Sequence, residues 1–178
     1  MRAAIGDIAI FGVGSARLEQ VTATLLARAE VKLAIVESAT GGEVARLLRA
    51  TEDGATIVTA SYVVDGPEML AARLSLSLAK LEAFGWVSEM CAAEAAATLI
   101  DTYEGDWGLA VLGDMHVSAD VYGAETGQTF VALGAPDATI VQRFPYGGSG
   151  PLARNWVVLR SLDLLRRQAI ARLDAKSL

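Results

Sequence analysis

Residues 37–42, with the sequence Glu-Ser-Ala-Thr-Gly-Gly, are the part of this chain whose residue types and spacing best suit chemistry. The apolar run at 33–36 predicts a buried strand before them, and a helical pattern begins at Glu43. Ser38 would therefore stand at the open end of a sheet, with the following backbone N–H groups pointing outward at the positive end of the helix dipole. Such a junction suits an exposed nucleophile or a cradle for a phosphate or carboxylate.

The same stretch also has a purely structural interpretation. Ser38 or Thr40 would cap the following helix, because small hydroxyl side chains accept hydrogen bonds from the first free N–H groups of a helix. Gly41 and Gly42 would then form the turn between the strand and the helix. The residues alone leave both interpretations open.

The composition predicts a well-packed core and excludes some partners. Of the 178 residues, 53% are apolar, enough for one domain with a sizeable core. We expect an N-terminal extension at 1–14 and this domain at 15–178. The net charge of −6 implies no broad basic surface, so no nucleic acid is expected as a partner. Charged residues make up only 20%, which predicts surface buried in a homo-oligomer, most often a dimer.

The chain has a single cysteine, Cys91, which cannot form a disulfide within the chain. We expect it to be a small buried apolar residue. No stretch approaches the length needed to span a bilayer, and the first residues lack the pattern of a signal peptide. The sequence therefore predicts a cytoplasmic protein with no membrane partner, no metal and no cofactor.

Strand and helix patterns alternate along the chain and predict an α/β fold: a layered α/β/α domain with a mixed sheet and a long C-terminal helix. The last two strands are expected to form a hairpin, and the polar residues at 113–127 a long loop. Strands are expected at 33–36, 56–64, 107–112, 129–133 and 139–144, and helices at 15–30, 43–49, 89–103 and 152–173, with one or two more within 68–84.

The C-terminal helix carries apolar residues at near-helical spacing, which predicts a core face made of Leu152, Trp156, Leu159 and Leu162. Its arginines are expected to form a side that faces solvent or another subunit. They are Arg154, Arg160, Arg166, Arg167 and Arg172.

These motifs together resemble the C-terminal domain of the CinA (competence/damage-inducible) family over residues 17–173. Two stretches are specific: Glu-Ser-x-Thr-Gly-Gly at 37–42 and Gly-Trp-Val-Ser-Glu at 85–89. The resemblance implies a nicotinamide-mononucleotide deamidase, in which a serine activated by a lysine attacks the carboxamide and ammonia leaves. Ser38 takes the nucleophile position, and the backbone after it supplies hydrogen-bond donors. Supporting positions are Ala110, Val111, Gly113, Gly127, Thr129 and Leu-Asp-Leu-Leu at 162–165.

The chain departs from the family pattern in its second motif, Tyr-Ser-Asn-x-x-Lys, which falls on residues 65–70. Asp65 replaces the tyrosine and Leu70 replaces the lysine. A serine without its base loses ~10²–10⁴ in rate, so the resemblance implies weak or lost family activity. The chain's only lysines stand elsewhere, at Lys32, Lys80 and Lys176.

The third family motif, Thr-Gly-Ile-Ala-Gly-Pro, falls on residues 112–117, where its first glycine is Gly113. The arginine of Gly-Asp-Arg falls on Gly150, while Arg154 remains in the last helix. By resemblance, a small nucleotide-like ligand would contact Glu37, Thr40, Gly41, Gly42, Asp65, Gly113, Asp114 and Arg154.

A replacement base is conceivable in His116, the sole histidine, which lies in the rewritten loop. His116 would act on Ser38, with Asp65, Asp114 or Asp120 orienting it. The alternatives are a solvated histidine, or a divalent metal held by the same acidic cluster without a diagnostic spacing. Two function classes follow: an amidohydrolase of pyridine-nucleotide salvage with an altered base, and a lapsed homologue that binds a nucleotide-like ligand or a partner protein.

Overall fold

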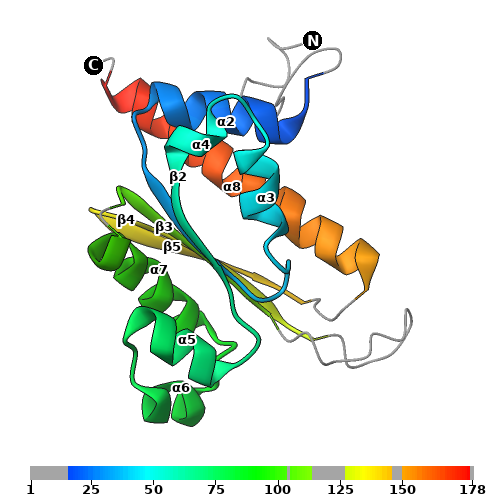
Figure 1. The fold of residues 1–178 in the computed structure, drawn as a ribbon, viewed down its shortest axis with the longest axis vertical. Coiled ribbons are helices and arrows are strands. Elements are labelled where there is room, and N and C mark those ends of the chain that lie inside the picture. The colour runs from blue at the N-terminus through cyan, green and yellow to red at the C-terminus, as the bar shows by residue number, and fades with distance from the viewer. Residues whose placement is uncertain (1–15, 104, 114–126, 146–149, 177–178) are drawn as a thin grey trace.

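The computed structural model describes residues 16–103, 105–113, 127–145 and 150–176. They form a five-stranded mixed sheet with helices on both faces, which confirms the predicted α/β/α architecture and the long C-terminal helix (Figure 1). The strands are β1 (Leu33–Glu37), β2 (Val58–Val63), β3 (Trp107–Gly113), β4 (Thr129–Ala135) and β5 (Ala138–Phe144). The helices are α2 (Leu18–Arg28), α3 (Glu43–Arg49), α4 (Gly54–Ile57), α5 (Pro67–Leu74), α6 (Leu78–Phe84), α7 (Glu89–Tyr103) and α8 (Pro151–Lys176).

The strand order is β2-β1-β3-β4-β5. Strand β1 pairs in parallel with β2 on one side and with β3 on the other. Strand β4 runs antiparallel to β3, and β5 runs antiparallel to β4, so the predicted hairpin is confirmed. The central strands are buried on both faces, as their continuous apolar sequences require.

Each central strand divides its side chains between two cores, because successive side chains of a strand point to opposite faces. On β1, Leu33 and Ile35 pack in the core that includes α2, α3, α4 and α8. Ala34 and Val36 pack in the other core, with α5, α6 and α7 (Figure 1). The sheet therefore separates two helical layers that share no core.

Helix α7 lies very close to the sheet through small side chains. A Cβ atom on Gly108 of β3 would stand 2.0 Å from the carbonyl oxygen of Ala96, so only glycine fits there. Cys91 on the same helix is 1% exposed, which confirms that it packs as a small apolar residue. The helix begins as expected, with the Cys91 N–H donating to Ser88 Oγ at 3.3 Å.

Two predictions about local structure were wrong. The strand expected at 56–64 begins only at Val58, because Gly54–Ile57 form the short helix α4. Of the residues expected on the core face of α8, only Leu162 is buried, whereas Leu152, Trp156 and Leu159 are 69%, 49% and 47% exposed. The helix buries a second, longer apolar stripe against the sheet instead, made of Val157, Val158, Leu162, Leu164, Leu165 and Ala169.

Arg166 also differs from the expectation of an outward-facing arginine. Its side chain is 2% exposed and pairs with Asp163 one turn earlier, at 2.7 Å. A buried guanidinium needs such a partner, because an unpaired charge in a core is strongly destabilising. Arg167, in contrast, is half exposed and pairs with the other oxygen of the same carboxylate.

Candidate functional site

The candidate site lies where the parallel strands end. Because β2, β1 and β3 run in the same direction, their last residues Val63, Glu37 and Gly113 share one edge of the sheet. The chain leaves β1 through α3 on one face and reaches β3 through α5, α6 and α7 on the other (Figure 1). This reversal between β1 and β3 is a topological switch point, the place where open α/β sheets usually bind ligands.

Glu37 is the last residue of β1 and is fully buried. Its carboxylate accepts hydrogen bonds from the backbone N–H groups of Val44 at 3.1 Å and Ala45 at 2.9 Å, and from the hydroxyl of Thr40. Burial raises the pKa of Glu37 above its ordinary value, and these three donors partly oppose the rise. Glu37 therefore caps α3 from the preceding strand, a role that the sequence pattern did not predict.

The turn between β1 and α3 depends on two glycines. Gly41 and Gly42 have φ angles of 62° and 87°, in the left-handed region that favours glycine. This confirms the predicted turn. Neither Ser38 nor Thr40 caps α3, however, because two of its first N–H groups already donate to Glu37.

Ser38 is only 2% exposed, and its hydroxyl is bound on both sides by one residue of β3. The Gly113 N–H donates to Ser38 Oγ at 2.9 Å, and the Ser38 hydroxyl donates to the Gly113 carbonyl at 3.0 Å. The Ser38 N–H also donates to the Val111 carbonyl at 2.8 Å. The hydroxyl thus ties the end of β1 to the end of β3, and its proton points at a carbonyl oxygen, not at a base.

Thr129 is a polar neighbour that the predicted ligand set omitted. It is fully buried and pairs with Gly113 across β3 and β4. A Cβ atom on Gly113 would stand 2.8 Å from Thr129 Oγ1 and 2.7 Å from Ala39 Cβ. At the level of sequence, Thr129 counts only as support for the family resemblance. Its place opposite Gly113 puts a hydroxyl beside the two hydrogen bonds that join Ser38 to Gly113.

Arg154 approaches the site from the first turns of α8. Its positive charge helps to lower the pKa of Glu43, which is lowered mainly by a hydrogen bond from Arg46. Among the described residues, Arg154 Nε has no hydrogen-bond partner, although that atom is buried. Arg154 therefore brings a cationic group to the start of α3, next to the Gly41-Gly42 turn.

Neither of the two replaced family positions is a hydrogen-bond partner of the Ser38 hydroxyl, which is bound by Gly113. Leu70 on α5 is fully buried in the core on the α5–α7 side, where it packs as an ordinary apolar residue. Asp65 follows β2 at the same edge as the site and is exposed. The Val64 N–H before it donates to the Glu37 carbonyl at 2.9 Å, which brings the end of this segment alongside β1.

All three lysines have partners away from Ser38. Lys80 on α6 pairs with Glu94 at 2.8 Å, and Lys176 pairs with Glu30 at 2.9 Å. Lys32 precedes β1 and donates to the Thr56 carbonyl at 2.7 Å, at the opposite end of the strand. The base of the family motif therefore has no lysine substitute at the site.

Three residues of the predicted site lie outside the described residues: Asp114, His116 and Asp120. The hypothesis of a histidine base consequently stays a prediction. Within the described ranges, no group of three or more histidine, cysteine, aspartate or glutamate side chains could hold a metal ion. No helix in the same ranges is long and apolar enough to cross a membrane.

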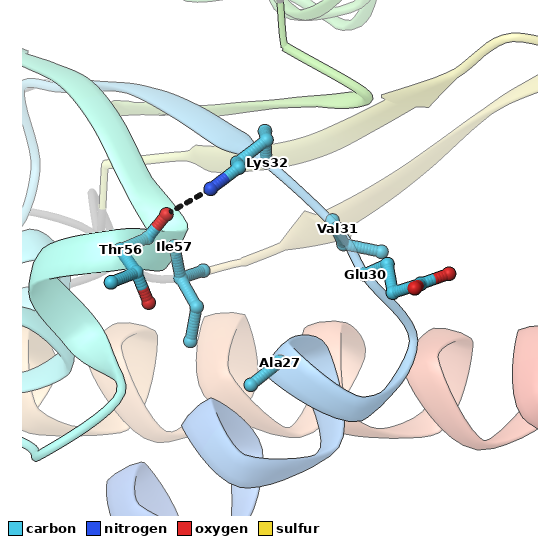
Figure 2. Close-up of a pocket in the computed structure, with 6 residues that line it drawn as sticks. All are labelled: Ala27, Glu30, Val31, Lys32, Thr56 and Ile57. Atoms are coloured by element: carbon cyan, nitrogen blue, oxygen red, sulfur yellow. Dashed lines mark hydrogen bonds between the residues drawn. The ribbon is translucent and has the colours of Figure 1, made fainter.

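A separate hollow lies at the other end of the sheet. It has a volume of about 230 Å³ and is lined by residues from the end of α2, the start of β1 and helix α4. Figure 2 shows its only drawn hydrogen bond, from Lys32 to the Thr56 carbonyl, and Glu30 pointing away from the other lining residues. Lys32 is exposed, so this hollow lacks the buried polar groups that surround Ser38.

Comparison with known proteins defines the class. The family model of the CinA C-terminal domain matches residues 15–169, so the chain belongs to that family. A competence-damage inducible protein of Clostridium botulinum is 29% identical over 161 residues, and a CinA-like protein of Kosmotoga olearia is 27% identical over 158 residues. These alignments cover 90% and 89% of this chain but only 39% and 38% of the relatives, so the chain spans about two fifths of their length.

Solved structures agree on the fold. The crystal structure of a competence-damaged protein (CinA) superfamily protein from Klebsiella pneumoniae superposes with a TM-score of 0.77 at 22% identity. The match covers 86% of this chain and 96% of that protein. The match thus includes nearly the whole of that protein. The site residues of the present chain differ from the family motifs at the positions given above.

Proposed function

We propose that this CinA C-terminal domain is related to the nicotinamide-nucleotide amidases but hydrolyses the carboxamide of nicotinamide mononucleotide weakly or not at all. The observation that carries the proposal is the state of the Ser38 hydroxyl, which donates to the Gly113 carbonyl at 3.0 Å and is 2% exposed. A nucleophilic serine needs a base that takes its proton as the oxygen attacks. A carbonyl oxygen is far too weak a base for that role.

The family residues that would supply a base support the same conclusion. The motif lysine is replaced by Leu70, which is buried in the apolar core. Each of the chain's three lysines is engaged at another place. Loss of the proton acceptor alone costs ~10²–10⁴ in rate, and the loss is nearly complete where nucleophile and base act as a unit.

The test is ammonia release from nicotinamide mononucleotide by the purified protein, beside Ser38→Ala. We expect the two proteins to release ammonia at the same rate, close to the rate without protein. Ser77→Ala, which changes an exposed serine that caps α6, is the matched control for an unrelated serine substitution. Turnover that Ser38→Ala abolishes and Ser77→Ala preserves would show that another base serves Ser38.

A second candidate function, binding of a nucleotide-like anion without turnover, is favoured by Arg154. Its buried Nε has no acceptor among the described residues, and guanidinium groups bind phosphate and carboxylate strongly. Isothermal titration with nicotinamide mononucleotide and with nicotinic acid mononucleotide tests this function. We expect Arg154→Ala to weaken binding by about tenfold or more. Arg49→Ala, an exposed arginine at the far end of α3, is expected to bind like the unmodified protein.

Absence of binding of both nucleotides to the unmodified protein would contradict this second function. Equal binding by Arg154→Ala would contradict the role given to the arginine but not the binding itself.

A further inference from the structure

Strand β2 forms one edge of the sheet and has a neighbouring strand on one side only. It is the first strand in the order β2-β1-β3-β4-β5 and pairs with β1 alone. Figure 1 shows it at the end of the sheet, with α4 leading into it. The outer side of an edge strand carries backbone N–H and C=O groups that have no partner in the sheet, and these groups can bind another extended segment.

The pairing of β2 with β1 shows which backbone groups point outward. The Val64 N–H donates to the Glu37 carbonyl at 2.9 Å, so Val64 directs its backbone groups towards β1. Successive residues alternate in this direction, and the register is regular from Ala60 to the end of β2. Ser61 and Val63 therefore direct their N–H and C=O groups away from the sheet. Within the described ranges, no backbone hydrogen bond joins either residue to a segment beyond the sheet.

The sequence of β2 lacks the features that usually prevent an edge strand from pairing. Its six residues, Val-Thr-Ala-Ser-Tyr-Val at 58–63, include no charged residue and no proline. The last of them, Val63, is 52% exposed. At the opposite edge of the sheet, in contrast, β5 carries the exposed Arg143. Strand β2 is thus the edge that is open to another strand.

We propose that β2 pairs with β2 of a second copy of this chain, antiparallel about a twofold axis at Ser61. In an antiparallel pair, residues with outward backbone groups must lie opposite one another, which the pairing of Ser61 with its own copy satisfies. Val63 then lies opposite Thr59, so that residues 59–63 of both copies take part. The two sheets become one continuous sheet across the axis.

The side chains of β2 fit this self-pairing. With the axis at Ser61, the large Tyr62 lies opposite the small Ala60 of the other copy, and no like charges face each other along the strands. An axis at Tyr62 would pair only residues 61–63 within the strands. It would also place two tyrosines opposite each other, each with the guanidinium of Arg73 at 5.3 Å from its ring centre. The second copy is the occupant because β2 itself supplies a neutral strand of matching shape.

Such a contact closes after two molecules. Both copies use the same surface, and each chain has only one β2, so the product is a dimer and not an open chain. Five residues of each strand form a small interface, for which an affinity in the micromolar range is expected.

The first experiment is sedimentation velocity of the full chain at concentrations up to about 100 µM. We expect the unmodified protein to form dimers. Ser61→Lys places two like charges directly opposite each other at the axis and is expected to weaken the dimer by about tenfold or more. Thr139→Lys, which changes an exposed residue of the other edge strand, is the matched control and should dimerise like the unmodified protein. Circular dichroism verifies that both variants are folded.

The second experiment tests the register by disulfide cross-linking. The Cα atoms of an opposed, hydrogen-bonded pair are about 5.5 Å apart, within the range of a disulfide, so Ser61→Cys should cross-link to its own copy under mild oxidation. Thr59→Cys should not, because four residues along the strand separate it from its own copy by more than about 13 Å. A mixture of Thr59→Cys and Val63→Cys should cross-link. The natural Cys91 is buried and does not compete.

Three results would overturn the proposal. The first is an unmodified protein that stays monomeric at 100 µM, and the second is a Ser61→Lys variant that associates as strongly as Thr139→Lys. The third is cross-linking of Thr59→Cys alone that is as efficient as that of Ser61→Cys, which would contradict the axis at Ser61. The cysteine variants carry small side chains, so they test the pairing even if Ser61→Lys does not fold.

Discussion

The two ends of strand β1 differ sharply in how their polar groups are held. At the carboxyl end, Glu37 and Ser38 are buried, and each makes several hydrogen bonds within the fold. At the amino end, the side chain of Lys32 is exposed and donates one hydrogen bond, to the Thr56 carbonyl at the rim of a hollow of about 230 Å³. The buried and hydrogen-bonded polar side chains are thus found at the carboxyl end of β1, away from this hollow.

This difference indicates which end the fold depends on. A buried polar group left without a partner costs about 1–3 kcal/mol, whereas an exposed one simply exchanges its partner for water. The polar groups at the carboxyl end should therefore be sensitive to single substitutions, and those at the amino end should tolerate them. The following predictions test that contrast, in order of decreasing effect.

The largest effect is expected for Glu37→Ala. Two N–H groups at the start of α3 and the hydroxyl of Thr40 would lose their common acceptor. We expect the free energy of unfolding to fall by about 2–4 kcal/mol, since several buried donors are left unpaired at once. Urea denaturation measures the change, and a loss below that of Lys32→Met would contradict the role of Glu37 as a cap.

Gly113→Ala should be the next most damaging. The new Cβ would stand 2.7 Å from Ala39 Cβ, so the backbone that clamps Ser38 must shift. Overpacking of this kind costs about 1–3 kcal/mol. Gly150→Ala is the matched control, because a Cβ there meets nothing within 4 Å, and thermal denaturation of both variants should separate them clearly.

Ser38→Ala should destabilise the protein even though the change is small in volume. The variant loses both hydrogen bonds to Gly113, leaving a buried N–H and a buried carbonyl without that partner. We expect a loss of about 1–2 kcal/mol in the free energy of unfolding. An unchanged unfolding midpoint would mean that the clamp contributes nothing to the fold.

A pH effect should distinguish Glu37 from an ordinary exposed carboxylate. Burial raises the pKa of Glu37 in the folded state, so the folded protein binds this proton more tightly than the unfolded chain does. Its contribution to stability is full below the unfolded pKa and is lost as the pH rises through the folded pKa. Relative to Glu37→Gln, the unmodified protein should lose stability as the pH rises from about 4 towards neutrality. A difference between the two that grows in the opposite direction would contradict a raised pKa.

The smallest effect is expected at the other end of β1. Lys32→Met removes an exposed hydrogen bond to the Thr56 carbonyl, which water can replace. The free energy of unfolding should change by no more than about 0.5 kcal/mol. Chemical denaturation of Lys32→Met and Glu37→Ala in parallel measures the contrast between the two ends of β1. Equal losses in the free energy of unfolding would contradict that contrast.

Much of the fold could be predicted from local sequence. Glu43–Arg49 and Glu89–Tyr103 have the bounds expected from their patterns, because each combines helix-forming residues with a clear start. The β4–β5 hairpin was signalled by a turn sequence between two runs of β-formers. In α8, by contrast, two apolar stripes compete, and periodicity alone could not tell which one faces the sheet.

The candidate site could be located from sequence but not understood from it. Glycines at 41 and 42 marked the turn, and the family motif marked Ser38. The hydrogen-bond partner of Ser38, however, is Gly113, which is 75 residues away in the chain. The bond is made by the backbone of a glycine, and no sequence pattern predicts such a bond. The ligand contact expected of Glu37 stays a prediction. What the sequence did not indicate is that its carboxylate accepts a hydrogen bond from the first turn of α3, a role that depends on tertiary proximity.

The most direct test of the central proposal is intact-mass spectrometry of the protein after mixing with excess nicotinamide mononucleotide and quenching in acid. A working serine nucleophile would form an ester with the substrate's acyl group as ammonia leaves, adding the corresponding mass to the protein. We predict an unmodified mass for the protein and for Ser38→Ala alike. An acyl adduct that forms on the unmodified protein, maps to Ser38 and is absent from Ser38→Ala would contradict the account.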